Sequence, residues 1–341
     1  MKSVYHEENP MLTQWRKRDA LYALQDTTDE STVIQLCDQV LEGVGSDPFV
    51  PREATILITK YGTVGKSDLA QKVYEQGLEA GAQSEDEMRV KCALMNTYRQ
   101  DGRFDEAKAL FLELDSNMAY KLDAKAVRQC AAVAGELLDQ ELLDRAINAA
   151  DADPSIDVPI ELHVARIKIA AHASGVDAAQ QVLDEVVTKQ TETGRKFAPK
   201  QAVPLFEALA NAYVAAGNHE GVLRTAEAMV GACQRPTERV VLQAIEATRQ
   251  LGDNEPTNEQ LEFVVQRFRA GPPIRVEVYE ALMETLGEIG NHAGVCVVYR
   301  EAMSKRRPTQ RMGELLHAAL RNQPRETADE IIEALNIQLK L

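Results

Sequence analysis

The sequence predicts an all-α protein, folded as a right-handed α-solenoid of about eight helix-turn-helix repeats with a period of about 36 residues. Three observations predict this fold. Four segments nearly coincide when aligned, the apolar residues in each follow helical spacing, and a glycine recurs between the two apolar runs. No segment shows the alternation of apolar and polar residues that would favour a strand over a helix.

The four strong copies begin at Ala54, Cys92, Phe206 and Tyr279, and weaker copies cover 127–150, 164–187, 241–252 and 313–334. The turns of the copies fall at Gly65, Gly102, Gly175, Gly217, Gly252, Gly290 and Gln323, with gaps of 37, 73, 42, 35, 38 and 33 residues. The gap of 73 residues is two periods, and it holds the degenerate copy at 127–150. A repeat that extends over most of the chain predicts stacked units rather than one globular core.

Each copy predicts two helices around a tight turn. In the first strong copy the apolar residues before and after Gly65 are Ile56, Leu57, Tyr61, Leu69, Val73, Tyr74 and Leu78. One helix pair cannot bury both of its apolar faces, so neighbouring pairs must stack. Small residues at matching places of the second helix permit a close helix approach; they are Ala70, Ala107, Ala179 and Ala328.

Segments rich in turn-forming residues are expected to separate the repeats, at 45–51, 193–199, 253–259 and 270–275. None is long enough for a free linker between domains. The predicted organisation is an N-terminal helical segment or degenerate repeat at 1–49, a repeat array at 50–335 and a C-terminal tail at 336–341.

Composition excludes several classes of protein. The 38 basic and 53 acidic residues give a net charge of −15, which disfavours binding to duplex nucleic acid through phosphate neutralisation. Aromatic residues make up 5%, so platforms for stacking bases are scarce. No apolar stretch is long enough to insert into a membrane, and the first residues lack the pattern of a targeting segment. The five dispersed cysteines, none in a C-x-x-C pair, predict reduced and buried thiols.

The strong copies read ATILITKYGTVG from Ala54, CALMNTYRQDG from Cys92 and YEALMETLGEIG from Tyr279. One position of the first helix distinguishes two repeat families. It lies three residues before the recurring aromatic position, and a tetratricopeptide repeat has a small residue there. In the four strong copies this position holds Ile58, Met95, Ala210 and Met283. Three of these four are bulky. The pattern therefore resembles the pentatricopeptide repeat over roughly residues 50–335, with the tetratricopeptide repeat as the second choice.

The resemblance implies a protein of mitochondria or chloroplasts that binds single-stranded RNA, one base per repeat, through polar residues on the first helix and at the end of the repeat. The first-helix position falls on Thr55, Cys92, Ala165, Glu207, Leu242, Glu280 and Gly313, and only Thr55 has the usual residue type. The second position falls on Glu87, Thr237, Arg275 and Pro308, none of which completes a reading pair. The motif thus favours the fold and disfavours base-by-base reading of RNA.

Two motifs suggest chemistry but have simpler structural interpretations. GTVGKS at 62–67 approaches the phosphate-binding loop G-x-x-x-x-G-K-[ST], but position 60, which requires glycine, is Lys60. His219 and His292 occupy the same place in two copies and are interpreted as helix-start residues. No histidine pair has the spacing of a metal site on one helix face. We expect no enzymatic activity, no cofactor, no metal and no small-molecule substrate.

Charge is unevenly distributed along the chain. Residues 101–157 carry 13 acidic and 6 basic side chains, whereas residues 267–311 carry 5 acidic and 8 basic ones. The candidate contacts to a partner or to RNA are Arg300, Lys305, Arg306, Arg307, Arg311 and Thr55. The basic residues at the end of one repeat also suit the negative end of a helix dipole. A second candidate is the basic run at 16–18, beside Trp15.

Two hypotheses follow. The first is a non-catalytic interaction scaffold, a subunit of an organellar ribonucleoprotein or other multiprotein assembly, whose partners are proteins of that assembly. The second is a direct binder of single-stranded RNA, ribosomal RNA included.

Overall fold

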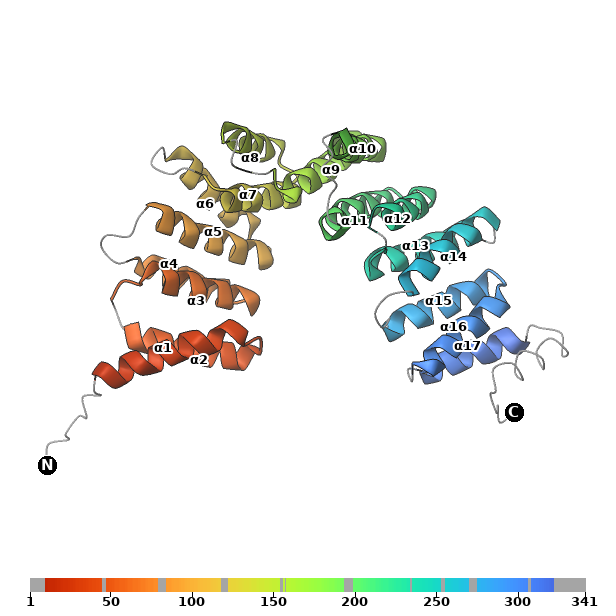
Figure 1. The fold of residues 1–341 in the computed structure, drawn as a ribbon, viewed down its shortest axis with the longest axis horizontal. Helices are drawn as coiled ribbons and strands as arrows, with labels where there is room; N and C mark the ends of the chain where they lie inside the picture. The colour runs from red at the N-terminus through yellow and green to blue at the C-terminus, as the bar shows by residue number, and fades with distance from the viewer. Residues whose placement is uncertain are drawn as a thin grey trace, which may run out of the picture. The chain divides into compact units, whose positions relative to one another are not determined.

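The computed structural model describes residues 10–44, 47–78, 84–117, 122–153, 156, 158–192, 199–233, 235–252, 255–269, 275–305 and 308–321. Within this part of the chain there are 17 α-helices and no strand (Figure 1). The chain divides into two compact units, Met1–Ile169 and Ala170–Leu341. The all-α fold predicted from the repeats is confirmed.

Unit 1 consists of helix pairs that follow one another along the chain. The helices are α1 (Pro10–Asp26), α2 (Glu30–Val44), α3 (Pro51–Thr63), α4 (Ser67–Gln76), α5 (Ser84–Gln100), α6 (Phe104–Ser116), α7 (Ala124–Leu137), α8 (Gln140–Ala152) and α9 (Ile160–Ser174), within which the unit ends. The first helices stack in the order α1, α3, α5 and α7, and each packs on its own second helix. Side chains from α1 to α9 share one apolar core.

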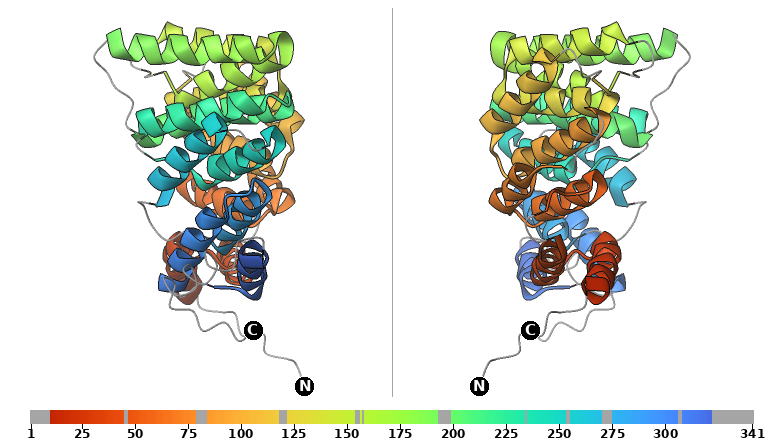
Figure 2. Two further views of the ribbon diagram at one scale, coloured as in Figure 1. Left: turned by 90° about the vertical axis from the view of Figure 1, so that its right-hand side faces the viewer. Right: turned by 90° about the vertical axis from the view of Figure 1, so that its left-hand side faces the viewer.

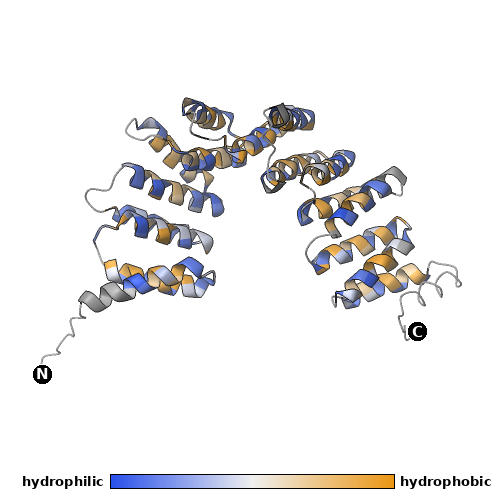
Figure 3. Ribbon diagram, in the orientation of Figure 1, coloured by the Kyte–Doolittle hydropathy of each residue, from blue (hydrophilic) through white to orange (hydrophobic). Residues whose placement is uncertain are grey.

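Unit 2 repeats this arrangement. Its remaining helices are α10 (Val176–Glu192), α11 (Pro199–Ala215), α12 (His219–Cys233), α13 (Glu238–Leu251), α14 (Glu255–Arg269), α15 (Val276–Glu288), α16 (His292–Ser304) and α17 (Gln310–Arg321). The first helices α11, α13, α15 and α17 stack on one another (Figure 2). In both units each helix contains both apolar and polar residues, as expected of amphipathic helices (Figure 3).

The turn residues inferred from the repeat have the predicted backbone conformation. Gly65, Gly102, Gly175, Gly217, Gly252 and Gly290 all have positive φ, between 65° and 89°. Glycine adopts this region without steric cost. In the degenerate copy the same place belongs to Leu138, with φ of 55°, the single non-glycine residue with positive φ in the described part of the chain. The missing glycine explains why this copy is hard to recognise, although its helices form.

The small residues of the second helices are packing positions. Ala70, Ala107 and Ala179 are each fully buried, as predicted, while Ala328 lies outside the described residues. The aromatic residues of the first helices, Tyr61 and Tyr98, are buried beside them. Each repeat therefore completes its core only with its neighbours.

The prediction that 253–259 separates two repeats was wrong. Residues 255–259 belong to the first turns of α14, and not to a joint between repeats. Pro256 is compatible with this helix because proline is tolerated in the first turn, where its missing N–H is not needed.

The segment at 45–51 does join two repeats, and there the Phe49 N–H donates to the Gly77 carbonyl over 2.9 Å. The predicted boundaries at 49 and 335 stay predictions.

All five cysteines are buried and free. Burial raises the pKa of Cys37 and Cys92 to about 12 and that of Cys233 to about 11. Thiols with such pKa values are protonated at neutral pH and serve as small apolar side chains. Within the described residues, no helix combines the length and the apolar character needed to cross a bilayer.

We predict that Ala107→Glu lowers the free energy of unfolding by about 3 kcal/mol or more, because an unpaired carboxylate enters a contact with no room for it. Ala109→Glu is the matched control, since Ala109 lies on the same helix and is exposed. Denaturant unfolding followed by circular dichroism measures both variants. Equal stability of the two would contradict the packing role of Ala107.

Candidate interaction surface

The predicted RNA-reading positions of unit 1 are buried or hydrogen-bonded within the repeats. Thr55 lies on α3, half-buried, and its hydroxyl donates to the Pro51 carbonyl of the same helix over 2.8 Å. Cys92 and Ala165, the next two positions, are buried. Glu87, the predicted partner of Thr55, is bound by Lys91 over 2.9 Å.

In unit 2 two predicted first-helix positions, Glu207 and Glu280, accept hydrogen bonds from threonines; Thr237 is a predicted second position, whereas Thr309 follows the predicted Pro308. The Thr237 hydroxyl donates to the Glu207 carboxylate over 2.7 Å, and the Thr309 hydroxyl donates to Glu280 over 2.5 Å. Each threonine also accepts a backbone N–H at the start of its own helix, from Val240 and from Met312. A threonine that caps one first helix thus joins it to the preceding first helix.

Further polar pairs join the first helices of unit 2. Gln243 on α13 donates its side-chain amide to Asn211 on α11 over 2.7 Å, and Arg275 pairs with Glu238. Helix α15 contains four glutamates, Glu277, Glu280, Glu284 and Glu288, and no basic residue. Of these, Glu284 pairs with Arg311 and Glu288 with Arg249. The surface on α15 is thus acidic, with its cations supplied by the neighbouring first helices.

The predicted basic cluster is only partly described. Arg300 on α16 is exposed, while Lys305, at the end of the same helix, forms an ion pair of 2.7 Å with Glu301. Arg311 on α17 forms its ion pair with Glu284 over 2.9 Å. Arg306 and Arg307 lie outside the described residues, as do the side chains of Trp15 and Arg16 in the other basic candidate. Lys305 thus pairs at the end of its own helix, and Arg311 pairs with the preceding first helix.

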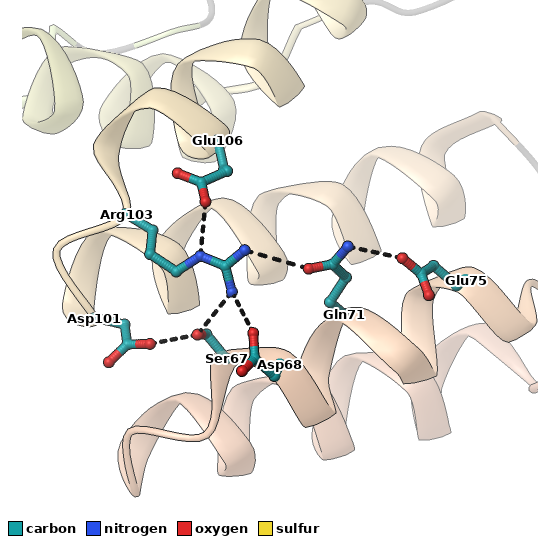
Figure 4. Close-up of polar contacts among 7 residues, drawn as sticks. All are labelled: Ser67, Asp68, Gln71, Glu75, Asp101, Arg103 and Glu106. Carbon is teal, nitrogen blue, oxygen red and sulfur yellow. Dashed lines mark hydrogen bonds and ion pairs between the residues drawn. The ribbon is translucent and has the colours of Figure 1, made fainter.

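A polar network joins two consecutive repeats of unit 1 near their turns (Figure 4). The Arg103 guanidinium contacts Ser67, Asp68, Gln71 and Glu106, with Nη1 2.8 Å from Asp68 and Nε 2.9 Å from Glu106. It also lies 4.5 Å from the centre of the Tyr98 ring. An arginine can meet several acceptors at once because its five N–H donors are fixed in one plane.

The same network includes Ser67, the last residue of the GTVGKS segment at 62–67 that resembles a phosphate-binding loop. Ser67 is buried, and its hydroxyl bonds to Asp101 and Arg103 of the next repeat. Lys66 pairs with Glu30 over 3.1 Å. The segment forms the turn between α3 and α4, as predicted, and its polar groups bind the neighbouring repeats.

The parallel histidines are helix-start residues, as predicted: α12 begins at His219 and α16 at His292. The residue before each is an asparagine that caps the helix, since Asn218 accepts the Gly221 N–H and Asn291 accepts the Gly294 N–H, each over 2.9 Å. A side chain at Gly221 would collide with the Tyr213 ring. The caps explain the shared Gly-Asn-His-x-Gly sequence better than a catalytic role.

A buried cation also lies between repeats of unit 1, and it has no sequence signal of its own. The side chain of Lys91 on α5 is 2% exposed, and its ammonium lies 2.7 Å from Glu113 and 2.9 Å from Glu87. Burial opposes the charge, but the hydrogen bonds to Glu113 and Glu87 outweigh it and raise the pKa of Lys91. Among the described residues, no three His, Cys, Asp or Glu side chains are grouped to hold a metal ion.

Comparisons with known proteins find likeness in structure alone. No protein-family model and no curated protein matches the chain. The crystal structure of the pentatricopeptide repeat protein PPR10 from maize is similar over 95% of this chain and 44% of its own, with 15% identity and a TM-score of 0.44. The structure of PPR10 in complex with an 18-nt psaJ RNA element is similar over 98% of this chain and 52% of its own, with 13% identity and a TM-score of 0.49.

The chain therefore spans about half the length of these structures. They are helical-repeat proteins of the family that the repeat motif resembles. The likeness is one of fold, so the function of this chain has to be inferred from its own residues.

We predict that Arg103→Ala lowers the free energy of unfolding by about 1–2 kcal/mol, because several charge-assisted hydrogen bonds between two repeats are lost together. Arg89→Ala should cost about 0.5 kcal/mol or less, since Arg89 is exposed and pairs only along its own helix. Hydrogen exchange should report faster opening of α4 and α6 in the first variant only. Unchanged exchange there would show that the network does not hold the repeats together.

A second prediction concerns pH. The pKa of Lys91 is higher in the folded state than its ordinary value of 10.5, so its ion pairs stabilise the fold at neutral pH and this contribution is lost as the pH rises above that value. Denaturant unfolding of the wild type and of Lys91→Met, from about pH 8 to about pH 11, should show a steeper loss of stability in the wild type. Lys72→Met, at an exposed position, is the control and should follow the wild type. Parallel profiles for all three proteins would refute this assignment.

Proposed function

We propose that the protein is a non-catalytic helical-repeat scaffold that holds proteins of a larger assembly, as a subunit of an organellar ribonucleoprotein or other complex. The observation that carries this proposal is the pairing of Glu207 with Thr237 and of Glu280 with Thr309. Groups that bind each other across two repeats are not available to read a base edge.

Charge supports the same proposal. The helix α15 carries four glutamates, and two of the candidate cations, Lys305 and Arg311, are held by Glu301 and Glu284. Binding to RNA draws most of its free energy from cations that neutralise phosphates. A chain with a net charge of −15 and an acidic first helix in this position favours proteins, basic ones above all, as partners.

The alternative is direct binding of single-stranded RNA, and the resemblance to pentatricopeptide repeats is what favours it. The exposed Arg300, together with the cations at 305–307 and 311, would then supply non-specific phosphate contacts. The organellar location is likewise a prediction from the resemblance, and imaging of the tagged full-length protein against organelle markers tests it.

We predict that the purified protein binds single-stranded RNA no more tightly than about 10⁻⁴ to 10⁻⁶ M, with an affinity that falls steeply as salt is added. Joint replacement of Arg300, Lys305, Arg306, Arg307 and Arg311 by alanine should abolish this binding for all sequences alike. Thr55→Ala, whose hydroxyl is bound within its own helix, should change nothing. Fluorescence anisotropy on unrelated oligonucleotides at two salt concentrations measures each case.

The opposite outcome is equally specific. Nanomolar binding to one oligonucleotide that survives added salt and weakens with Thr55→Ala would establish a sequence-specific RNA-binding protein instead. Affinity purification with and without nuclease then tests the scaffold directly, because protein partners held by the repeats should remain after the RNA is digested.

A further inference from the structure

One pocket in unit 2 lies between two consecutive repeats. The second helices α12 and α14 pack on each other, whereas α14 and α16 are separated by a pocket of about 410 Å³. The helix α15 forms the base of this pocket, with Leu282, Leu286 and Ile289.

The pocket has an apolar floor. Leu261 and Val265 from α14, Leu282 and Ile289 from the α15 segment, and Val298 from α16 are all buried below it. Val297 stands at its rim with 48% of its surface exposed. A cavity of roughly 150 Å³ holds a benzene-sized group, so this pocket has room for two or more branched aliphatic side chains.

The rim carries charge of one sign. Glu262 is the one charged residue that lines the pocket, it is exposed, and within the described part of the chain it has no cationic partner. Gln266 and Asn291, the other polar lining residues, are neutral. An occupant that complements this surface presents aliphatic side chains and, one turn away, a lysine or arginine.

We infer that the pocket between α14 and α16 docks an amphipathic helix of a partner protein, with aliphatic side chains on the apolar floor and a Lys or Arg against Glu262. This inference rests on the proposed function and names the site and the chemistry of one partner. Helices commonly bind in apolar grooves through residues spaced three or four apart. The acidic rim and the negative net charge of the chain select a basic helix over an acidic one.

The test uses the full-length protein and synthetic helical peptides of about 16 residues, long enough to form helix. The parent peptide carries two leucines four positions apart and lysines beside them; one control replaces the leucines with alanine, and another replaces the lysines with glutamate. Binding is measured by fluorescence anisotropy. We expect the parent peptide to bind at least about tenfold more tightly than either control.

Two variants locate the binding. Val297→Asp should weaken the parent peptide by about tenfold or more, while Val214→Asp, at a valine that is 45% exposed on α11, should bind it like the wild type. Glu262→Lys should reverse the preference, so that the glutamate peptide binds better than the lysine peptide. Because all three sites are exposed, circular dichroism should show that each variant is folded.

Several results would overturn the inference. Equal effects of Val297→Asp and Val214→Asp, or no reversal with Glu262→Lys, would show that the pocket does not bind the peptide. Self-association of the protein that Val297→Asp abolishes would mean that a second copy fills the pocket, and displacement of the peptide by an RNA oligonucleotide would assign it to nucleic acid. If the peptides fail while nuclease-resistant partners still co-purify with Val297→Asp, the pocket inference falls and the scaffold stands.

Discussion

The fold depends on stacking, because a single pair of helices cannot bury its own apolar faces. Ala107, Tyr98, Ala70 and Tyr61 are all buried in the apolar core that α1 to α9 share. Close packing of the core and directional bonds together fix the relative position of two repeats. Arg103 provides such bonds near the turns of unit 1, and the threonine caps provide them along the first helices of unit 2.

This requirement also limits what the first helices can do. A carboxylate that accepts a hydrogen bond from the next repeat, as Glu207 does from Thr237, is already satisfied, and a base edge would have to replace that bond at a loss of repeat packing. Reading of RNA needs polar groups that are fixed in place and still unbonded toward the ligand. In this chain the polar groups at Glu207 and Glu280 bond to the next first helix, and the proposed scaffold function rests on those bonds.

The sequence predicts those features that recur with the repeat. The positive φ at Gly65 and Gly102 and the burial of Ala70 and Ala107 follow from position within one copy, since each depends on local conformation or on the nearest helix. The hydrogen bonds made by Thr237 and Arg103 could not be predicted. They join residues about one repeat apart, and whether those residues meet depends on the rotation and shift between neighbouring repeats. Leu138 shows the opposite case, in which the fold keeps a conformation that its residue disfavours.

A pocket between second helices is a place where a repeat protein can bind a particular partner. The regular positions of such a stack are occupied by contacts between neighbours, so a surface made of them offers a ligand little that differs from one repeat to the next. The opening between α14 and α16 exposes Val297 over an apolar floor, beside the carboxylate of Glu262. An apolar floor supplies binding free energy and a single charge at its rim supplies orientation, and neither contact competes with the bonds that hold the first helices together. The bonds that join the first helices and the proposed partner contacts at Val297 and Glu262 are thus made by different side chains.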